Sequence, residues 1–306
     1  MAERDSFFVP AAMPKPAWID VEGVSTCYFD AGAGDPVILI HGGNMGAAEA
    51  SIGAACWMFN IAPLAEHFHV VAFDRLGQGY TDAPLRDEDY TMAASARHAQ
   101  AFLKALDLSP AHLVGHSRGA FIAARVALES PKLVRSLTLV SSSTLMPLVA
   151  TNEATLMPCP MPPLSREACR WVLRNYSFNP DLIPDDWIDM AFASVQSAEY
   201  RKGVSKMVDE GLRTRLFIPA LARQKRETIN LINEGRLQRP TQIIWGFNDR
   251  TATYEGAFAL FQTISAYERQ ATVHILNNAG HFVFAEQPSR FNALVKQFVR
   301  RVTTGL

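Results

Sequence analysis

The residues that could carry chemistry begin at positions 113–121, LVGHSRGAF, where a single serine stands between two glycines. Gly115, Ser117 and Gly119 fit the pattern G-x-S-x-G, and they lie between an apolar run and a helical pattern. Where a strand turns sharply into a helix at such a motif, the serine hydroxyl is exposed and the helix N–H groups favour negative charge beside it. The motif therefore predicts that Ser117 is a nucleophile.

A serine hydroxyl is a poor nucleophile at neutral pH, so it needs a base that a third group orients. Two later segments supply these groups in the chain order Ser, Asp, His. Asp249 ends the apolar run 242–249, and His281 follows the apolar run 273–280. Because ligands in open α/β sheets bind at the carboxyl ends of the strands, we expect the three side chains to meet there. His281 would accept the Ser117 proton and return one to the leaving group, while Asp249 would orient the imidazole.

An oxyanion formed by attack of the serine needs hydrogen-bond donors. The segment 41–44, HGGN, follows an apolar run and offers glycine N–H groups. We assign the backbone amides of Gly43 and Arg118 to this oxyanion hole, with Gly42 as the alternative to Gly43.

Short apolar runs alternate with longer helical patterns over most of the chain, which predicts right-handed crossovers and a doubly wound, mostly parallel sheet. The expected strands lie at 35–43, 67–75, 111–117, 134–142, 240–249 and 271–281, and the expected helices lie at 92–108, 119–130, 255–264 and 289–302. The first 20 residues are interpreted as a loosely structured lead-in.

The alternation stops at about residue 143, where proline-rich loops and helical patterns replace it until about residue 238. We interpret residues 143–238 as a helical lid inserted after the sixth strand of a core. Residues 1–142 and 239–306 would form the two parts of that core.

Composition excludes several classes of protein. The formal net charge is −1, from 29 basic and 30 acidic residues, which predicts no nucleic-acid partner and no membrane-surface partner. The first residues lack the basic segment and apolar block of a signal peptide. The cysteines show no close pair, so we expect free thiols and a cytoplasmic protein, with a homodimer left open. These cysteines are Cys27, Cys56, Cys159 and Cys169.

Other polar residues are interpreted as structural. Asp74 and Asp82 lie in a loop where such side chains usually accept hydrogen bonds from backbone amides. Gly77 and Gly79 form a fragment too short for a dinucleotide-binding motif, so no nicotinamide or flavin cofactor is expected. We also expect no metal site, because five histidines lack acidic partners at ligand spacing. These are His67, His69, His98, His112 and His274.

Several motifs together resemble those of the α/β-hydrolases, from about Val24 to Val302: HGG, FDRLGQGYTD, GHSRG, WGFNDR and AGHFVFAEQP. The stretches HGGNMGAAEA and NPDLIPDDWIDMAFAS are similar to the meta-cleavage-product hydrolase branch, including members like monoalkyl phthalate hydrolases. That branch cuts carbon–carbon bonds in ring-opened aromatic compounds. The resemblance implies an eight-stranded sheet, a Ser-His-Asp triad and no cofactor.

The chain departs from this branch at three positions. His116 stands where the family usually has asparagine, Phe282 where it has tryptophan, and Ala191 where its lid carries an arginine for the dienoate. Losing that arginine would remove a bidentate clamp on the substrate carboxylate.

These departures favour an ester over a carbon–carbon bond as the target. The leading interpretation is a serine hydrolase that cleaves, through an acyl-enzyme, a small aromatic or short-chain monoester bearing a carboxylate, such as a monoalkyl phthalate. The alternative is carbon–carbon hydrolysis of 2-hydroxy-6-oxo-hexa-2,4-dienoates. A ligand-binding receptor that retains a hydrolase pocket is a third hypothesis.

The substrate would be held by residues near the nucleophile and in the lid. The Arg118 side chain either pairs with the substrate carboxylate or turns outward to an acidic group of the protein. The other predicted substrate-binding residues are Gly42, Asn44, Trp171, Arg174 and Phe282.

Overall fold

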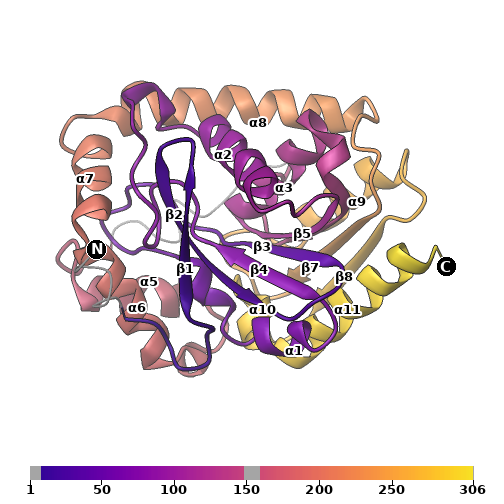
Figure 1. Ribbon diagram of the computed structural model, residues 1–306, viewed down its shortest axis with the longest axis horizontal. Helices are drawn as coiled ribbons and strands as arrows, with labels where there is room; N and C mark the ends of the chain where they lie inside the picture. The colour runs from indigo at the N-terminus through magenta and orange to yellow at the C-terminus, as the bar shows by residue number, and fades with distance from the viewer. Residues whose placement is uncertain (1–7, 148–158, 306) are drawn as a thin grey trace.

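A computed structural model describes residues 8–147 and 159–305. Its strands form one eight-stranded sheet in the order β1-β2-β4-β3-β5-β6-β7-β8 (Figure 1). The strands are β1 (Pro16–Val21), β2 (Val24–Ala31), β3 (Pro36–Ile40), β4 (His69–Phe73), β5 (Ala111–His116), β6 (Val134–Val140), β7 (Thr241–Gly246) and β8 (Thr272–Leu276).

All neighbouring strands from β4 to β8 pair in parallel, whereas β1 and β2 are antiparallel. This architecture confirms the predicted doubly wound, mostly parallel sheet. Nearly all residues of β3 to β7 are buried, because both faces of the sheet are covered. On β5, for example, Leu113 belongs to the core on one face and Val114 to the core on the other.

The first strand corrects one expectation, because β1 lies inside the segment interpreted as a loose lead-in. β1 and β2 form a hairpin in which Val21 pairs with Val24 across a two-residue turn. The turn residues Glu22 and Gly23 both have positive φ, 53° and 86°, as a tight hairpin turn requires. A Glu-Gly pair is a weaker hairpin signal than Asn-Gly or Asp-Gly, and the prolines before it favour a loop.

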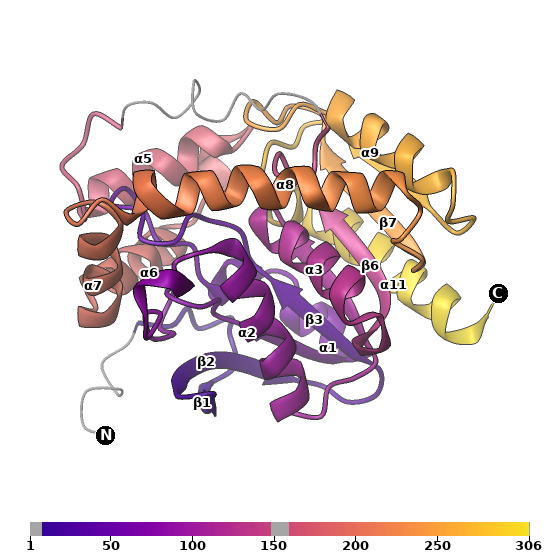
Figure 2. The same cartoon turned by 90° about the horizontal axis from the view of Figure 1, so that it is seen from above.

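Helices cover both faces of the sheet. On one face, α8 (Ile218–Asn233) runs across α2 (Met92–Ala105) and α3 (Arg118–Glu129) and reaches α9 (Glu255–Ser265), as Figure 2 shows. The other face carries α1 (Ile61–Ala65), α10 (Val283–Glu286) and α11 (Pro288–Thr304). In the described ranges, no helix is both long and apolar enough to span a membrane.

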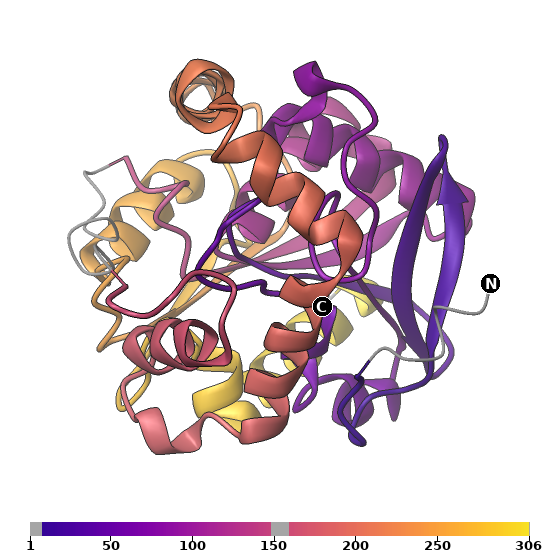
Figure 3. The same cartoon turned by 90° about the vertical axis from the view of Figure 1, so that its left-hand side faces the viewer.

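Helical structure fills the described chain between β6 and β7, as the sequence predicts. It comprises α5 (Arg166–Tyr176), the 3₁₀ turn η5 (Pro180–Leu182), α6 (Asp185–Gln196), α7 (Ala198–Met207) and the π-helical turn η6 (Arg213–Phe217), which continues into α8. Figure 3 looks at the molecule from the side of α7, with these inserted helices in front of the sheet. The boundaries at 142/143 and 238/239 stay a prediction, although β6 ends at Val140 and β7 begins at Thr241.

Two of the histidines interpreted as structural are buried and hydrogen-bonded. His98 Nε2 lies 2.9 Å from Thr26 Oγ1, and His112 Nδ1 lies 2.7 Å from Ser136 Oγ. Burial lowers the pKa of each imidazole to about 4, because a charged ring would lose its hydration. Both rings are therefore neutral at neutral pH.

This pKa shift predicts that acid destabilises the fold between about pH 6.5 and 4, where the unfolded chain binds protons that the folded chain excludes. Between pH 7 and 4.5, His98→Gln should remove about 2–3 kcal/mol of this loss, because one pKa unit corresponds to about 1.4 kcal/mol. Urea unfolding of both proteins at pH 7, 5.5 and 4.5 measures the difference. Equal pH slopes would contradict the prediction. Burial raises the pKa of Asp74 to about 6, so protonation of this carboxyl stabilises the fold as the pH falls. This contribution is the same in both proteins and cancels in the comparison.

Candidate active site

A strained turn between β5 and α3 holds Ser117. Its backbone has φ 53° and ψ −120°, a conformation that residues with a side chain rarely adopt. The Ser117 N–H donates to the Val140 carbonyl (2.8 Å), and the Ser142 hydroxyl donates to the Ser117 carbonyl (2.7 Å). These bonds from the end of β6 hold the turn in its strained geometry.

The two glycines of the motif are required by packing. A Cβ atom on Gly119 would lie 2.1 Å from the carbonyl oxygen of Ile40 on β3, and one on Gly115 would lie 2.4 Å from the Gly119 carbonyl oxygen. Neither position has room for a side chain, because the start of α3 sits directly against the sheet. The pattern G-x-S-x-G thus follows from the close approach of helix and strand.

His281 and Asp249 form a buried pair. His281 Nδ1 lies 2.7 Å from Asp249 Oδ2, and the side chains are 5 % and 0 % exposed. The other carboxylate oxygen accepts bonds from the Thr251 N–H (2.8 Å), the Thr251 hydroxyl (2.8 Å) and the Ala252 N–H (3.0 Å). Asp249 is therefore held in one orientation. Because Nδ1 is occupied, Nε2 is the imidazole nitrogen left for a substrate.

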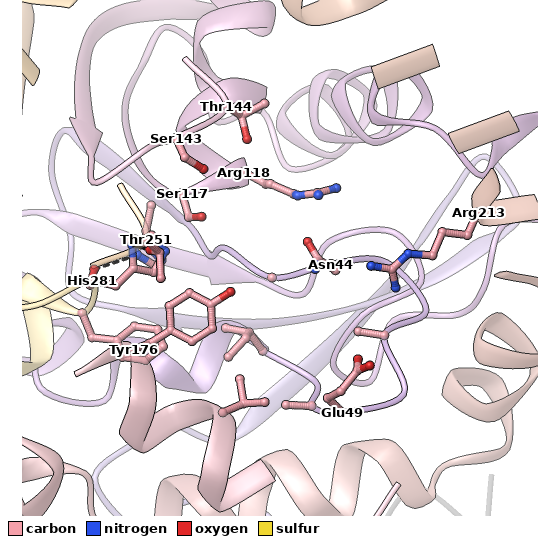
Figure 4. A pocket seen from close by; sticks show the side chains of 17 residues that line it. Asn44, Glu49, Ser117, Arg118, Ser143, Thr144, Tyr176, Arg213, Thr251 and His281 are labelled. Carbon is pink, nitrogen blue, oxygen red and sulfur yellow. Dashed lines mark hydrogen bonds between the residues drawn. The ribbon is translucent and has the colours of Figure 1, made fainter. Parts of the chain in front are cut away.

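Ser117 and His281 line the same cavity, whose volume is about 180 Å³ (Figure 4). Among the bonds of residues 8–147 and 159–305, none joins the Ser117 hydroxyl to the His281 ring. Such bonds are often long in unliganded enzymes and tighten when substrate binds. The remaining lining residues are Gly43, Asn44, Ala47, Glu49, Ala50, Ile52, His116, Arg118, Ser143, Thr144, Val172, Tyr176, Arg213, Thr251 and Phe282.

Two guanidinium groups lie in the cavity wall. Arg118 follows the nucleophile, and its Cζ lies 5.0 Å from the centre of the Phe217 ring. Arg213 comes from η6, and in Figure 4 both guanidinium groups point toward the space beside Asn44. Of the two alternatives for Arg118, the structure favours a side chain that faces the cavity. Sequence reasoning missed Arg213, because a basic residue in a helical pattern gives no sign of which way it faces.

Three predicted substrate-binding residues do not line the cavity. On α5 the lining residues are Val172 and Tyr176, which lie one turn apart on the same face. Trp171 and Arg174 are displaced by about 100° and 200° from Val172 around the helix, so they point elsewhere. Gly42 lies behind the wall, where an added Cβ would meet His116 Nδ1 and Ser117 Cβ at 2.8 Å.

The three departures from the family pattern are all buried. His116 Nε2 lies 3.0 Å from the His281 carbonyl oxygen. Burial lowers the pKa of His116 well below its usual value, and the charge of the nearby His281 ring lowers it further. Phe282 lines the cavity, and Ala191 packs in the core among the inserted helices. The cavity wall therefore has an apolar ring at Phe282, and Ala191 brings no charge to it.

The two acidic residues interpreted as structural do bind backbone amides. Asp74 accepts bonds from the N–H groups of Ala54 (2.6 Å) and Tyr80 (2.8 Å), and Asp82 accepts one from the Ser25 N–H (3.3 Å). This confirms the expectation for both residues. Thr251 was not anticipated, although its position two residues after Asp249 is typical of a turn that closes on a carboxylate.

Comparison with known proteins gives consistent results. A family described as "alpha/beta hydrolase fold" matches residues 35–288. The 2-hydroxy-6-oxo-6-(2'-aminophenyl)hexa-2,4-dienoic acid hydrolase of Metapseudomonas resinovorans is 28% identical, over 93% of this chain and 90% of its own length. The 2-hydroxymuconate semialdehyde hydrolase of Pseudomonas sp. (strain CF600) is also 28% identical, over 90% of this chain and 91% of its own length.

A solved structure extends the likeness to three dimensions. The meta-cleavage product hydrolase of Pseudomonas fluorescens IP01, complexed with acetates, superposes with a TM-score of 0.74 at 25% identity. The match covers 95% of this chain and 99% of that one. The predicted resemblance is therefore confirmed over nearly the whole chain.

The close packing at Gly119 generates a test of the turn. Gly119→Ala should lower the free energy of unfolding by about 2–4 kcal/mol and displace Ser117, because the new methyl group meets a backbone oxygen. Gly203→Ala, on α7, is the matched control, since nothing lies within 4 Å of its added Cβ. The control should raise stability by about 0.5–1 kcal/mol. Urea unfolding compares the variants, and equal effects would refute the packing argument.

Proposed function

The chain belongs to the α/β-hydrolase fold family, and on that basis we propose that it hydrolyses a carbon–carbon bond in a ring-opened aromatic compound that bears a carboxylate. The observation that carries the proposal is a single cavity lined by Ser117, by His281 with its bonded Asp249, and by two guanidinium groups. Small carboxylate substrates also appear in the names of the relatives described above.

In this proposal Ser117 is the nucleophile, His281 the general base and Asp249 the group that orients the imidazole. The 2.7 Å bond between His281 and Asp249 supports the assignment, because a carboxylate at Nδ1 fixes the tautomer with Nε2 free to take a proton. The amides of Gly43 and Arg118 form the oxyanion hole. Its position is supported by both residues lining the cavity beside Ser117.

The cavity wall has a polar part and an apolar part, which together would orient the substrate. The carboxylate lies toward Arg118, Arg213 and Asn44, where charged and amide donors gather. The other end of the substrate packs against apolar side chains. These are Ala50, Ile52, Val172 and Phe282.

The reaction needs a tautomerisation before attack. The proton of the substrate's 2-hydroxyl is lost and one is gained at C5, which gives a ketone. Ser117 Oγ then bonds to C6, and its proton passes to His281. The C5–C6 bond breaks, and the departing enolate takes the proton held by His281. Water hydrolyses the acyl-serine, so the overall products are a carboxylic acid and a hydroxydienoate.

Hydrolysis of a carboxylate-bearing monoester is the second candidate. The observation that favours it is the identity of Phe282 and Ala191, which supply no polar group where the resemblance implies tryptophan and arginine. An ester requires only a protonated alkoxide as leaving group, so the same triad would suffice.

Homodimer formation and a cytoplasmic location stay predictions.

A substrate panel distinguishes the two candidates. With a 2-hydroxy-6-oxo-hexa-2,4-dienoate, a phthalate monoester and p-nitrophenyl acetate, we expect the highest kcat/KM on the dienoate, followed by its absorbance. Ser117→Ala should lower kcat by at least about 10³-fold because the nucleophile is lost. Ser265→Ala, at the exposed end of α9, should leave the rate unchanged. Preference for the phthalate monoester would select the ester candidate instead.

Removing either guanidinium group tests the carboxylate contact. Arg118→Met and Arg213→Met should each raise KM for the dienoate by roughly 10–100-fold, as expected for loss of a charge-assisted hydrogen bond of about 1.5–3 kcal/mol. The methyl ester of the same substrate should be unaffected. Arg174→Met is the matched control on α5, outside the cavity. Equal losses on acid and ester would show that the arginines act on something other than the carboxylate.

A further inference from the structure

A buried arginine lies directly beneath the loop assigned to the oxyanion hole. Arg75 follows β4 and is 2 % exposed. Its Nη2 donates to the carbonyl oxygens of Gly42 (2.5 Å) and Gly43 (2.8 Å) and to Gln78 Oε1 (2.8 Å). One guanidinium group thus binds two consecutive peptide carbonyls of the 41–44 loop.

These bonds determine where the next amides point. In a trans peptide the C=O of one residue and the N–H of the next point in opposite directions. With the Gly42 and Gly43 carbonyls turned to Arg75, the N–H groups of Gly43 and Asn44 point away from it. Gly43, Asn44 and Ser117 line the cavity, whereas Arg75 does not. Amides turned away from Arg75 are therefore placed to reach the cavity.

The loop has few other means of holding this geometry. Gly43 has φ +91°, which glycine adopts freely, and an added Cβ would lie 2.9 Å from the Ile52 side chain. Two carbonyl oxygens that face one site repel each other, and the Arg75 cation that both accept from offsets this repulsion. His41 gives the second support, since its Nδ1 lies 2.8 Å from the Gly42 oxygen and its Nε2 accepts a bond from the Arg75 N–H (3.0 Å).

Arg75 carries its charge without an ion pair to a carboxylate within residues 8–147 and 159–305. Burial is the main cause that lowers the pKa of Arg75 to about 9, and repulsion by the nearby Arg118 is the next. The group therefore stays charged at neutral pH. Asp74, the neighbouring buried carboxyl, favours the charge through space, but placing a cation in the interior without a direct ion pair still costs stability.

We propose that Arg75 is a positioning residue for the oxyanion hole: it aims the Gly43 and Asn44 amides at the reacting carbonyl, and its charge strengthens their hold on the oxyanion. The proposal rests on Ser117 as nucleophile but not on which bond is cleaved. It assigns the Asn44 amide as a further donor beside Gly43 and Arg118. Donors fixed before the reaction stabilise the transition state without reorganising.

The experiment compares Arg75→Met and Arg75→Lys with the intact enzyme on p-nitrophenyl acetate and on the dienoate. Losing the aimed donors should lower kcat by about 10²–10³-fold for Arg75→Met, while KM changes by less than about threefold. Arg75→Lys keeps a cation that reaches fewer of the three acceptors, so its kcat should lie between the two.

Binding of a phenylboronate separates positioning from general loss of structure. Ser117 Oγ adds to boron, its proton passes to His281, and the resulting tetrahedral anion occupies the oxyanion hole. We expect the boronate Kd to weaken by about 10²-fold in Arg75→Met, whereas benzoate, which forms no such adduct, should bind within about threefold of the intact enzyme. Equal weakening of both ligands, or an unchanged kcat, would overturn the proposal.

Arg125→Met is the control for removing a buried guanidinium elsewhere. Arg125 is 8 % exposed and pairs with Glu129 along α3, away from the cavity. The Arg125→Met variant should have a lower unfolding temperature, with kcat and boronate affinity unchanged. If Arg75→Met fails to fold, Arg75→Lys carries the same comparison. Failure of the proposed function would appear separately, as full activity and boronate binding in Ser117→Ala.

Discussion

The contact between the first turn of α3 and strand β3 is the constraint on which the rest of the site depends. An added Cβ on Gly119 would lie 2.1 Å from the Ile40 carbonyl oxygen, so helix and strand touch backbone to backbone. This approach forces the chain to turn within one residue and leaves Ser117 at φ 53° with its hydroxyl toward the cavity. Hydrogen bonds from the end of β6 stabilise this strained backbone, together with the hydrophobic core on both faces of the sheet.

The proposed base is positioned by the inserted helices as well as by the sheet. The His281 N–H donates to the Tyr176 carbonyl at the end of α5 (2.9 Å). Nearby, the buried Glu286 accepts bonds from the N–H groups of Phe178 (2.8 Å) and Gly280 (2.9 Å). Tyr176 also lines the cavity, and burial raises the pKa of its phenol, which keeps it a neutral donor. Under the proposed function, the segment that selects the substrate also orients the imidazole.

Much of the architecture follows from local patterns, whereas the cavity wall does not. The G-x-S-x-G motif and the apolar runs before Asp249 and His281 predict an edge of the sheet where strands end, because parallel strands share their direction. Helix α5 lies within residues 143–238, where helical patterns were expected. Which of its faces meets the cavity depends on how α5 docks, so Val172 and Tyr176 line it in place of Trp171 and Arg174. Arg75 and Arg213 were missed for a similar reason, because the 41–44 loop and the cavity wall beside which they lie are formed by residues distant in the chain.

The three arginines near the cavity differ in their access to solvent. Arg118 and Arg213 are partly exposed in the wall, while Arg75 is sealed beneath the loop. Dissolved ions screen charges that water reaches and leave buried ones almost untouched. Under the proposed function, ionic strength therefore acts on the two steps unequally. Added salt would weaken capture of the anionic substrate and leave the field at the reacting carbonyl nearly constant.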